Sequence, residues 1–110
     1  MFRECPSDVT VYLGSDLCLE AVVDKAETVT WLHDGTTLNN SKNKIVMKFL
    51  HGRASLRIQG VTKDNEGNYT CCAKSGVDPL KTKEESVHCH VKIKDGTCYD
   101  EVKLRRTLII

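Results

Sequence analysis

Gly67-Asn68-Tyr69-Thr70-Cys71 is the stretch that decides the fold of this chain. Its tyrosine stands two residues before a cysteine, which is the spacing of the corner tyrosine in sandwiches of two antiparallel β-sheets. Such sandwiches also carry a buried tryptophan on an earlier strand, and Trp31 lies upstream in the corresponding place. The stretch therefore predicts an all-β chain with Trp31, Tyr69 and Cys71 in its core. We expect the Tyr69 hydroxyl to anchor the corner that precedes it.

The strand that should supply a second core cysteine lies over residues 17–23. Its apolar residues recur at every second position, as Leu17, Leu19, Ala21 and Val23. Because successive side chains of a strand point to opposite faces, these four face the core and Cys18 points outward. The small side chain of Ala21 then stands where a cysteine would face Cys71. The sequence predicts a two-sheet sandwich that lacks the usual disulfide between its sheets.

Short alternating segments, separated by turn residues, continue along the rest of the chain. They lie over residues 9–11, 29–32, 45–49, 56–58, 69–73 and 87–93, with turns expected at 33–35 and 51–52. One domain over residues 1–94 accounts for all of them, and residues 95–110 form a linker or the start of a following element. We expect the core to contain Leu17, Leu19, Ala21, Trp31, Leu56, Ile58, Tyr69, Cys71 and Val91.

Several stretches carry a resemblance to a known family. Val29-Thr30-Trp31-Leu32-His33-Asp34-Gly35, with residues 52–61 and 67–71, resembles the immunoglobulin-like domains of the intermediate set (I-set). Within that set the chain looks most like the modules of muscle filament proteins, of the titin, obscurin and myosin-binding protein C families. The resemblance implies an immunoglobulin-like β-sandwich that binds proteins or spaces neighbouring modules. It also implies a cytoplasmic place in the sarcomere or cytoskeleton, where a core disulfide would be reduced anyway.

Two positions depart from the pattern of that family, and one of them is Ala21, which replaces its first core cysteine. An aspartate usually stands six residues before the cysteine of the corner strand, where this chain has Asn65. An amide oxygen can still accept backbone hydrogen bonds, but a carboxylate would make them roughly twice as strong. The resemblance therefore implies that the corner forms with weaker bonds.

Composition and motifs argue against several classes of function. The chain has 110 residues and a net charge of +1, so its charge balance does not favour nucleic acid or an anionic membrane surface. No apolar run is long enough to insert through a bilayer, and no catalytic triad or phosphate-binding glycine loop occurs. We expect no catalytic residue and no cofactor. The expected partners are other proteins or neighbouring immunoglobulin modules. The expected binding surfaces are the loop over residues 75–85 and the exposed face of the strands over residues 29–32, 69–73 and 87–93.

A metal site is a weaker hypothesis. His88 and His90 point outward from one expected strand, and Cys72 points outward from its neighbour. Two imidazoles and a thiolate are ligands that Zn²⁺ accepts. Their spacing matches no dedicated zinc motif, so surface residues of a sheet face are the simpler interpretation.

An extracellular adhesion or receptor domain is the alternative function. Six cysteines are many for 110 residues, and secreted domains of this size often depend on disulfides. Cys5, expected on the first strand, and Cys89, on the last one, are the candidate pair, because these two strands often lie side by side in such sandwiches. Asn39, in the sequon Asn39-Asn40-Ser41, is the candidate glycosylation site. The oxidation state of the thiols separates the two hypotheses.

Overall fold

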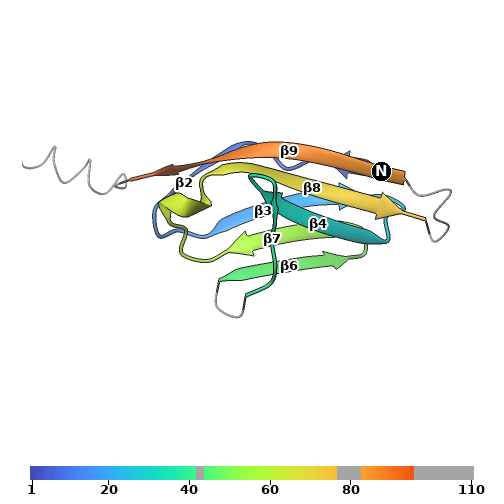
Figure 1. The fold of residues 1–110 in the computed structure, drawn as a ribbon, viewed down its shortest axis with the longest axis horizontal. Coiled ribbons are helices and arrows are strands. Elements are labelled where there is room, and N and C mark those ends of the chain that lie inside the picture. The colour runs from blue at the N-terminus through green and yellow to red at the C-terminus, as the bar shows by residue number, and fades with distance from the viewer. Residues whose placement is uncertain (42–43, 77–82, 96–110) are drawn as a thin grey trace, which may run out of the picture.

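The computed structural model describes residues 1–41, 44–76 and 83–95 and arranges them in two β-sheets packed face to face (Figure 1). One sheet has four strands, in the order β1 (Phe2–Glu4), β3 (Leu17–Val23), β7 (Arg53–Ile58) and β6 (Ile45–Leu50). The other has five, in the order β2 (Val9–Tyr12), β9 (Lys83–Lys94), β8 (Gly67–Ser75), β4 (Thr28–His33) and β5 (Thr36–Thr37). The predicted two-sheet sandwich is confirmed. Residues 77–82 of the expected binding loop and residues 96–110 lie outside the described part.

The core lies between the sheets and contains every residue that the alternating pattern assigned to it. Its buried members are Leu17, Leu19, Ala21, Val23, Trp31, Ala54, Leu56, Ile58, Val61, Tyr69, Cys71, Ala73, Cys89, Val91 and Ile93. On β3 the buried residues alternate with Cys18 and Glu20, which are exposed. The pleat of the strand therefore selects which residues become core, as the period of two predicts.

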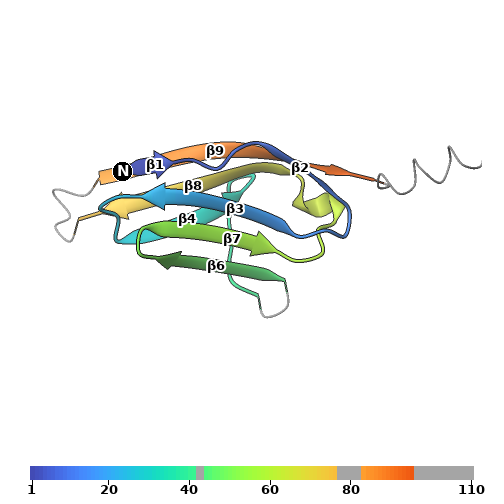
Figure 2. The ribbon, with the colours of Figure 1, turned by 180° about the vertical axis from the view of Figure 1, so that it is seen from behind.

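The amino-terminal segment differs from the single strand predicted over residues 9–11. It forms two short strands that join different sheets: β1 pairs antiparallel with β3, and β2 pairs parallel with β9. Figure 2, seen from behind, shows the chain passing from β1 to β2 along one edge of the sandwich. Cys5 lies between the two strands rather than on the first one. The expectation that Cys5 belongs to a strand was wrong, because the chain changes sheets where it lies.

Two-residue turns close the hairpins as the sequence predicted. Asp34 and Gly35 have φ angles of 48° and 85°, and His51 and Gly52 have φ angles of 51° and 79°. Left-handed conformations at both central residues match the twist of the flanking strands. The first turn leads into β5, a two-residue edge strand that the sequence did not predict, because no alternation is visible over so short a length.

Candidate functional site

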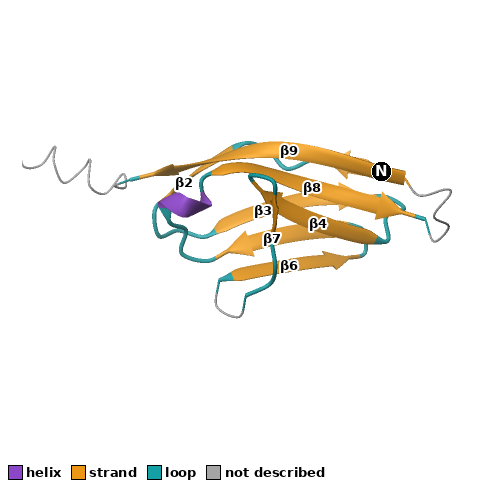
Figure 3. Ribbon diagram, in the orientation of Figure 1, coloured by secondary structure: helices purple, strands orange, loops and turns teal. Residues whose placement is uncertain are grey.

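The corner before β8 is built around Tyr69. Among the described residues there is one helical turn, η1 (Lys63–Asn65), drawn in purple in Figure 3. It ends at Asn65, whose carbonyl oxygen lies beside the Tyr69 hydroxyl. The fully buried Tyr69 donates its hydroxyl hydrogen to that carbonyl oxygen, and Asn65 Oδ1 accepts the Thr62 backbone N–H at 2.8 Å. Burial, with the charge of Asp34, raises the pKa of Tyr69 to about 12. Asn65 thus accepts the backbone hydrogen bond expected of the usual aspartate.

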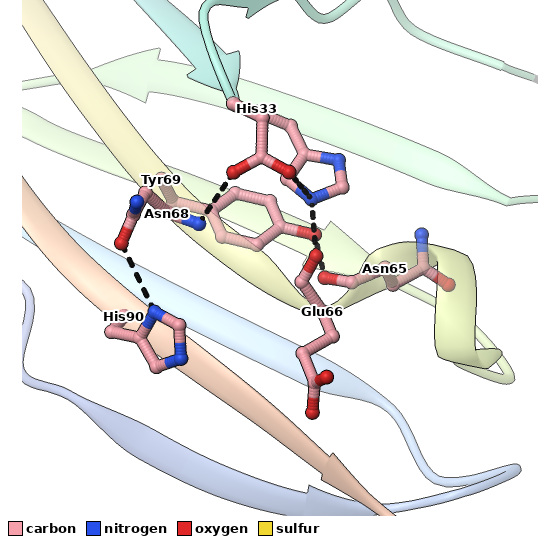
Figure 4. Close-up of polar contacts among 7 residues, drawn as sticks. His33, Asn65, Glu66, Asn68, Tyr69 and His90 are labelled. Carbon is pink, nitrogen blue, oxygen red and sulfur yellow. Dashed lines mark hydrogen bonds and ion pairs between the residues drawn. The ribbon is translucent and has the colours of Figure 1, made fainter.

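A layer of polar contacts covers Tyr69 at the same end of the sandwich (Figure 4). The His33 ring stacks on the Tyr69 ring, with centroids 4.5 Å apart and planes 9° from parallel. His33 Nε2 donates to the carbonyl of Glu66 at 2.8 Å, and Asp34 Oδ1 accepts the backbone N–H of Asn68 at 2.8 Å. These contacts tie the turn after β4 to the start of β8 and hold the corner strand in place.

Sequence reasoning missed this layer, although one signal for it was present. Gly67 opens β8 with a φ of 139°, and a Cβ there would lie 2.5 Å from Asp34 Oδ2. A glycine at the first residue of a strand indicates a close approach by another group. The approaching group could not be identified from the sequence, because Asp34 is 33 residues away.

Cys71, the cysteine of the corner strand, forms no disulfide. Cys71 is completely buried and lies opposite Trp31 in the register of β4 and β8. Burial raises the pKa of the Cys71 thiol to about 12, and burial together with Asp8 raises that of Cys89. Both stay protonated at neutral pH and are therefore poor nucleophiles. The absence of a bridge between the sheets, predicted from Ala21, is confirmed, since Cys71 is a free thiol.

The candidate pair Cys5 and Cys89 is not joined in the structure. All the described cysteines, namely Cys5, Cys18, Cys71, Cys72 and Cys89, are free thiols. Cys5 is exposed between β1 and β2, whereas the Cys89 side chain is buried on the inner side of β9. The two thiols therefore face different environments, and their pairing stays a prediction.

The outer side of β4, β8 and β9 forms a mostly polar surface, which we call the polar face. It consists of Thr28, Thr30, Leu32, Asn68, Thr70, Cys72, Lys74, Glu84, Ser86, His88 and His90. Residues directly opposite each other on β8 and β9 are bonded in pairs. Thr70 Oγ1 lies 2.8 Å from His88 Nδ1, Cys72 Sγ lies 3.1 Å from Ser86 Oγ, and Asn68 Oδ1 lies 3.0 Å from His90 Nδ1. The centre of this face carries no side chain with a permanent charge.

The candidate metal ligands Cys72, His88 and His90 each form a hydrogen bond with a different residue on the neighbouring strand. Each is bonded to the residue across from it, as described above. Within residues 1–41, 44–76 and 83–95, no three His, Cys, Asp or Glu side chains are grouped so that they could hold a metal ion. The three-ligand zinc site considered from the sequence therefore has no counterpart in this arrangement.

The outer side of the four-stranded sheet is charged. Arg57 pairs with Asp16 at 2.7 Å, and Arg53 pairs with Glu20 at 2.8 Å. The hydrogen bond from Arg57 holds the pKa of the Asp16 carboxyl below its usual value. Both pairs are exposed, and such pairs contribute little to stability. They cover the middle of this face with charge, which the polar face does not have.

Asn39 lies on the exposed loop between β5 and β6. It lines a cavity of about 340 Å³ at the open edge of the sandwich, between that loop, Trp31 and Phe49. The neighbouring Asn40 binds β6 through its side chain, which accepts the Met47 backbone N–H at 2.8 Å. Exposure makes Asn39 accessible for modification, and its glycosylation stays a prediction.

Comparison with known proteins supports an immunoglobulin-like domain over nearly the whole described chain. The family model of the immunoglobulin I-set domain matches residues 1–93. Hemicentin-1 of Mus musculus is 35% identical over 94 residues, which are 83% of this chain but 2% of hemicentin-1. The limbic system-associated membrane protein of Rattus norvegicus is 34% identical over 67 residues, which are 61% of this chain and 20% of that protein. The chain thus spans a small part of each relative.

Solved structures of titin modules share the fold. The titin domains z1z2 in complex with telethonin match with a TM-score of 0.76 and 28% identity, over 88% of this chain and 48% of that chain. A chimeric titin Z1Z2 matches with a TM-score of 0.76 and 27% identity, over 87% of this chain and 94% of that chain. In the part of the chain that the structure describes, no helix has the length and apolar character needed to span a bilayer.

Proposed function

The chain belongs to the immunoglobulin I-set family, and from that premise we propose that it is a non-catalytic module that binds another protein through its polar face. The supporting observation is the charge distribution over the two sheets. Protein interfaces are depleted of charged residues at their centres and carry polar groups at their rims. The rows Thr30–Cys72–Ser86 and Leu32–Thr70–His88 form an uncharged centre. Lys74 and Glu84 lie at one end of this face.

Desolvation explains why this face suits a partner better than the opposite one. A partner that covered Arg53, Arg57, Glu20 and Asp16 would remove water from four charges, and their mutual attraction need not offset that cost. Covering Thr30, Thr70 and Ser86 requires only that their hydroxyl groups be bonded, and those of Thr70 and Ser86 already have neighbours in the sheet. The polar face thus has the smaller desolvation cost.

Site-specific photo-cross-linking in the full chain tests the proposal. A benzophenone side chain is placed at Thr30, on the polar face, or at Ser55, on the outer side of β7. We expect protein adducts from position 30 and few from position 55, because only position 30 lies on the proposed binding surface. The two positions are a matched pair, since both carry small polar residues and lie on opposite faces. Adducts of equal yield from both positions, or adducts from Ser55 alone, would show that the polar face is not the binding surface.

The compartment is the finer part of the proposal. We propose an intracellular filament module, because the buried and unpaired thiol of Cys71 is stable in a reducing environment and the titin modules share this fold. Binding to telethonin by the titin z1z2 domains provides a precedent for a protein partner. The identity to hemicentin-1 and to a membrane protein supports a second candidate, an extracellular module in which Cys5 and Cys89 are bridged.

Intact mass before and after alkylation separates the two compartments. The full chain is isolated unreduced from its native source, denatured, and treated with iodoacetamide. Six alkylated cysteines would support the intracellular module. A protected Cys5–Cys89 pair, with sugar on Asn39, would overturn it in favour of the extracellular one. The mass of a chain that was reduced before alkylation provides the control, since it must always carry six adducts.

A further inference from the structure

His88 and His90 stand side by side on the polar face. Both are exposed and point outward from β9, since the residue between them, Cys89, is buried. Residues two apart on a strand are separated by about 6.7 Å along it. Each ring is bonded through Nδ1 to the residue directly opposite on β8. His88 is bonded to Thr70 in this way, and His90 is bonded to Asn68 (Figure 4). The two imidazoles are therefore held in the same orientation relative to the sheet.

These bonds determine which ring nitrogen can accept a ligand. Asn68 Oδ1 can only accept, so the hydrogen of a neutral His90 ring lies on Nδ1 and the lone pair on Nε2. The Thr70 hydroxyl can accept from His88 Nδ1 in the same way. Histidines that bind metals nearly always donate their second ring N–H to an oxygen, which fixes the ring. Among the described residues, neither Nε2 atom has a hydrogen-bond partner, so both lone pairs face solvent.

We propose that the Nε2 atoms of His88 and His90 form a two-imidazole site for a divalent transition-metal ion, with water completing the coordination. Imidazole suits Zn²⁺, Cu²⁺ and Ni²⁺. Tetrahedral Zn²⁺, with Zn–N distances of about 2.0–2.1 Å, would bring the two Nε2 atoms to about 3.3 Å from each other. The rings must lean toward each other, which requires rotations about χ1 and χ2 of these exposed side chains. The site lies on the polar face itself, and its test uses the free chain without a protein partner.

One negative and one positive side chain flank the pair, so neither sign of charge dominates beside it. The carboxylate of Asp8 lies beside the pair, since its Oδ1 accepts the backbone N–H of His90 at 2.8 Å. Lys92 is the next outward residue along β9 and carries the opposite charge. Cys72 is bonded to Ser86 and takes no part, so this site differs from the three-ligand arrangement considered from the sequence.

Nuclear magnetic resonance of the histidine ring nitrogens tests the site on the full chain, with Zn²⁺ alone as the probe. We expect Zn²⁺ at neutral pH to shift the Nε2 resonances of His88 and His90 together. The resonances of His33, bonded within the corner, and His51, in the β6–β7 turn, should stay in place. Zinc held by the exposed thiols of Cys5 or Cys18 would leave all ring nitrogens unchanged, so thiol binding cannot imitate the result.

Matched variants give the quantitative test. His88→Gln and His90→Gln should each weaken Zn²⁺ binding by about tenfold or more, because the second ligand acts at a high effective concentration. Asn68→Ala removes the bond that orients His90 and should weaken binding by about tenfold. His51→Asn should bind like the wild type. The proposal is overturned if the two rings do not shift, or if either glutamine variant binds Zn²⁺ as tightly as the wild type.

Discussion

The inward and outward side chains of β8 differ in burial and in the kind of contact they make, although they share one backbone. The inward side chains of Tyr69, Cys71 and Ala73 are completely buried and pack between the sheets. The outward side chains of Asn68, Thr70 and Cys72 bond to single neighbours on β9, where water can replace the partner. Inward residues therefore contribute to folding, and outward residues belong to the surface that we propose for partner binding. Substitutions on alternate positions of this strand should separate stability from binding.

Adding the missing bridge should give the largest effect on the inner side. Ala21→Cys places a thiol on β3 at the family position that faces Cys71, and oxidation would close a loop of about 50 residues. In the chain-entropy model such a loop raises the free energy of unfolding by about 4 kcal/mol. Chemical denaturation with and without reductant measures the gain. A double variant with Cys71→Ala should lose it, and a gain that persists there would refute the assignment of Ala21 opposite Cys71.

Alkaline pH should destabilise the chain through the same thiol. The pKa of Cys71 is raised from 9.0 to about 12 on folding, so the unfolded chain releases this proton first. Between these values the unfolded state binds fewer protons, and the free energy of unfolding falls as pH rises. By pH 11 the loss due to Cys71 is about 2–3 kcal/mol. Denaturant titrations from pH 8 to 11 should show a shallower fall for Cys71→Val than for the wild type. Parallel curves would contradict this.

Removal of the corner hydroxyl should have a smaller effect. Tyr69→Phe keeps the ring stacked on His33 but leaves the carbonyl of Asn65 without its donor. We expect the free energy of unfolding to fall by about 1–2 kcal/mol, as for the loss of a buried hydrogen bond. Urea denaturation at pH 7 measures it. A change within error would mean that water replaces the hydroxyl and that the corner does not depend on it.

The adjacent outward position should give the smallest effect. Thr70→Val also removes one hydroxyl, but this one meets His88 on the exposed side of the sheet. Surface substitutions of this kind usually change the free energy of unfolding by less than about 0.5 kcal/mol. The same urea experiment provides the comparison with Tyr69→Phe. If the free energy of unfolding fell equally in the two variants, the inward and outward sides of β8 would not differ in their contribution to stability.

Local patterns were enough to predict the sheets and their core. The period of two over residues 17–23 identified Ala21 as buried and Cys18 as exposed, and the Tyr69–Cys71 spacing identified the corner. The short strands β1 and β5 escaped prediction, because two or three residues show no alternation. The placement of Cys5 on a strand was wrong for the same reason. The chain leaves one sheet between β1 and β2, and this break produces no periodic pattern in the sequence.

The sequence by itself determined which residues face inward, because the pleat of a strand is a local property that repeats every two residues. It also determined that no disulfide crosses the core, since Ala21 stands at the position opposite Cys71. Only the tertiary structure decided which outward residues meet, such as His88 with Thr70 and Asp34 with Asn68. The reason is physical: these partners depend on the register between strands, which turns and packing of the whole sandwich set together.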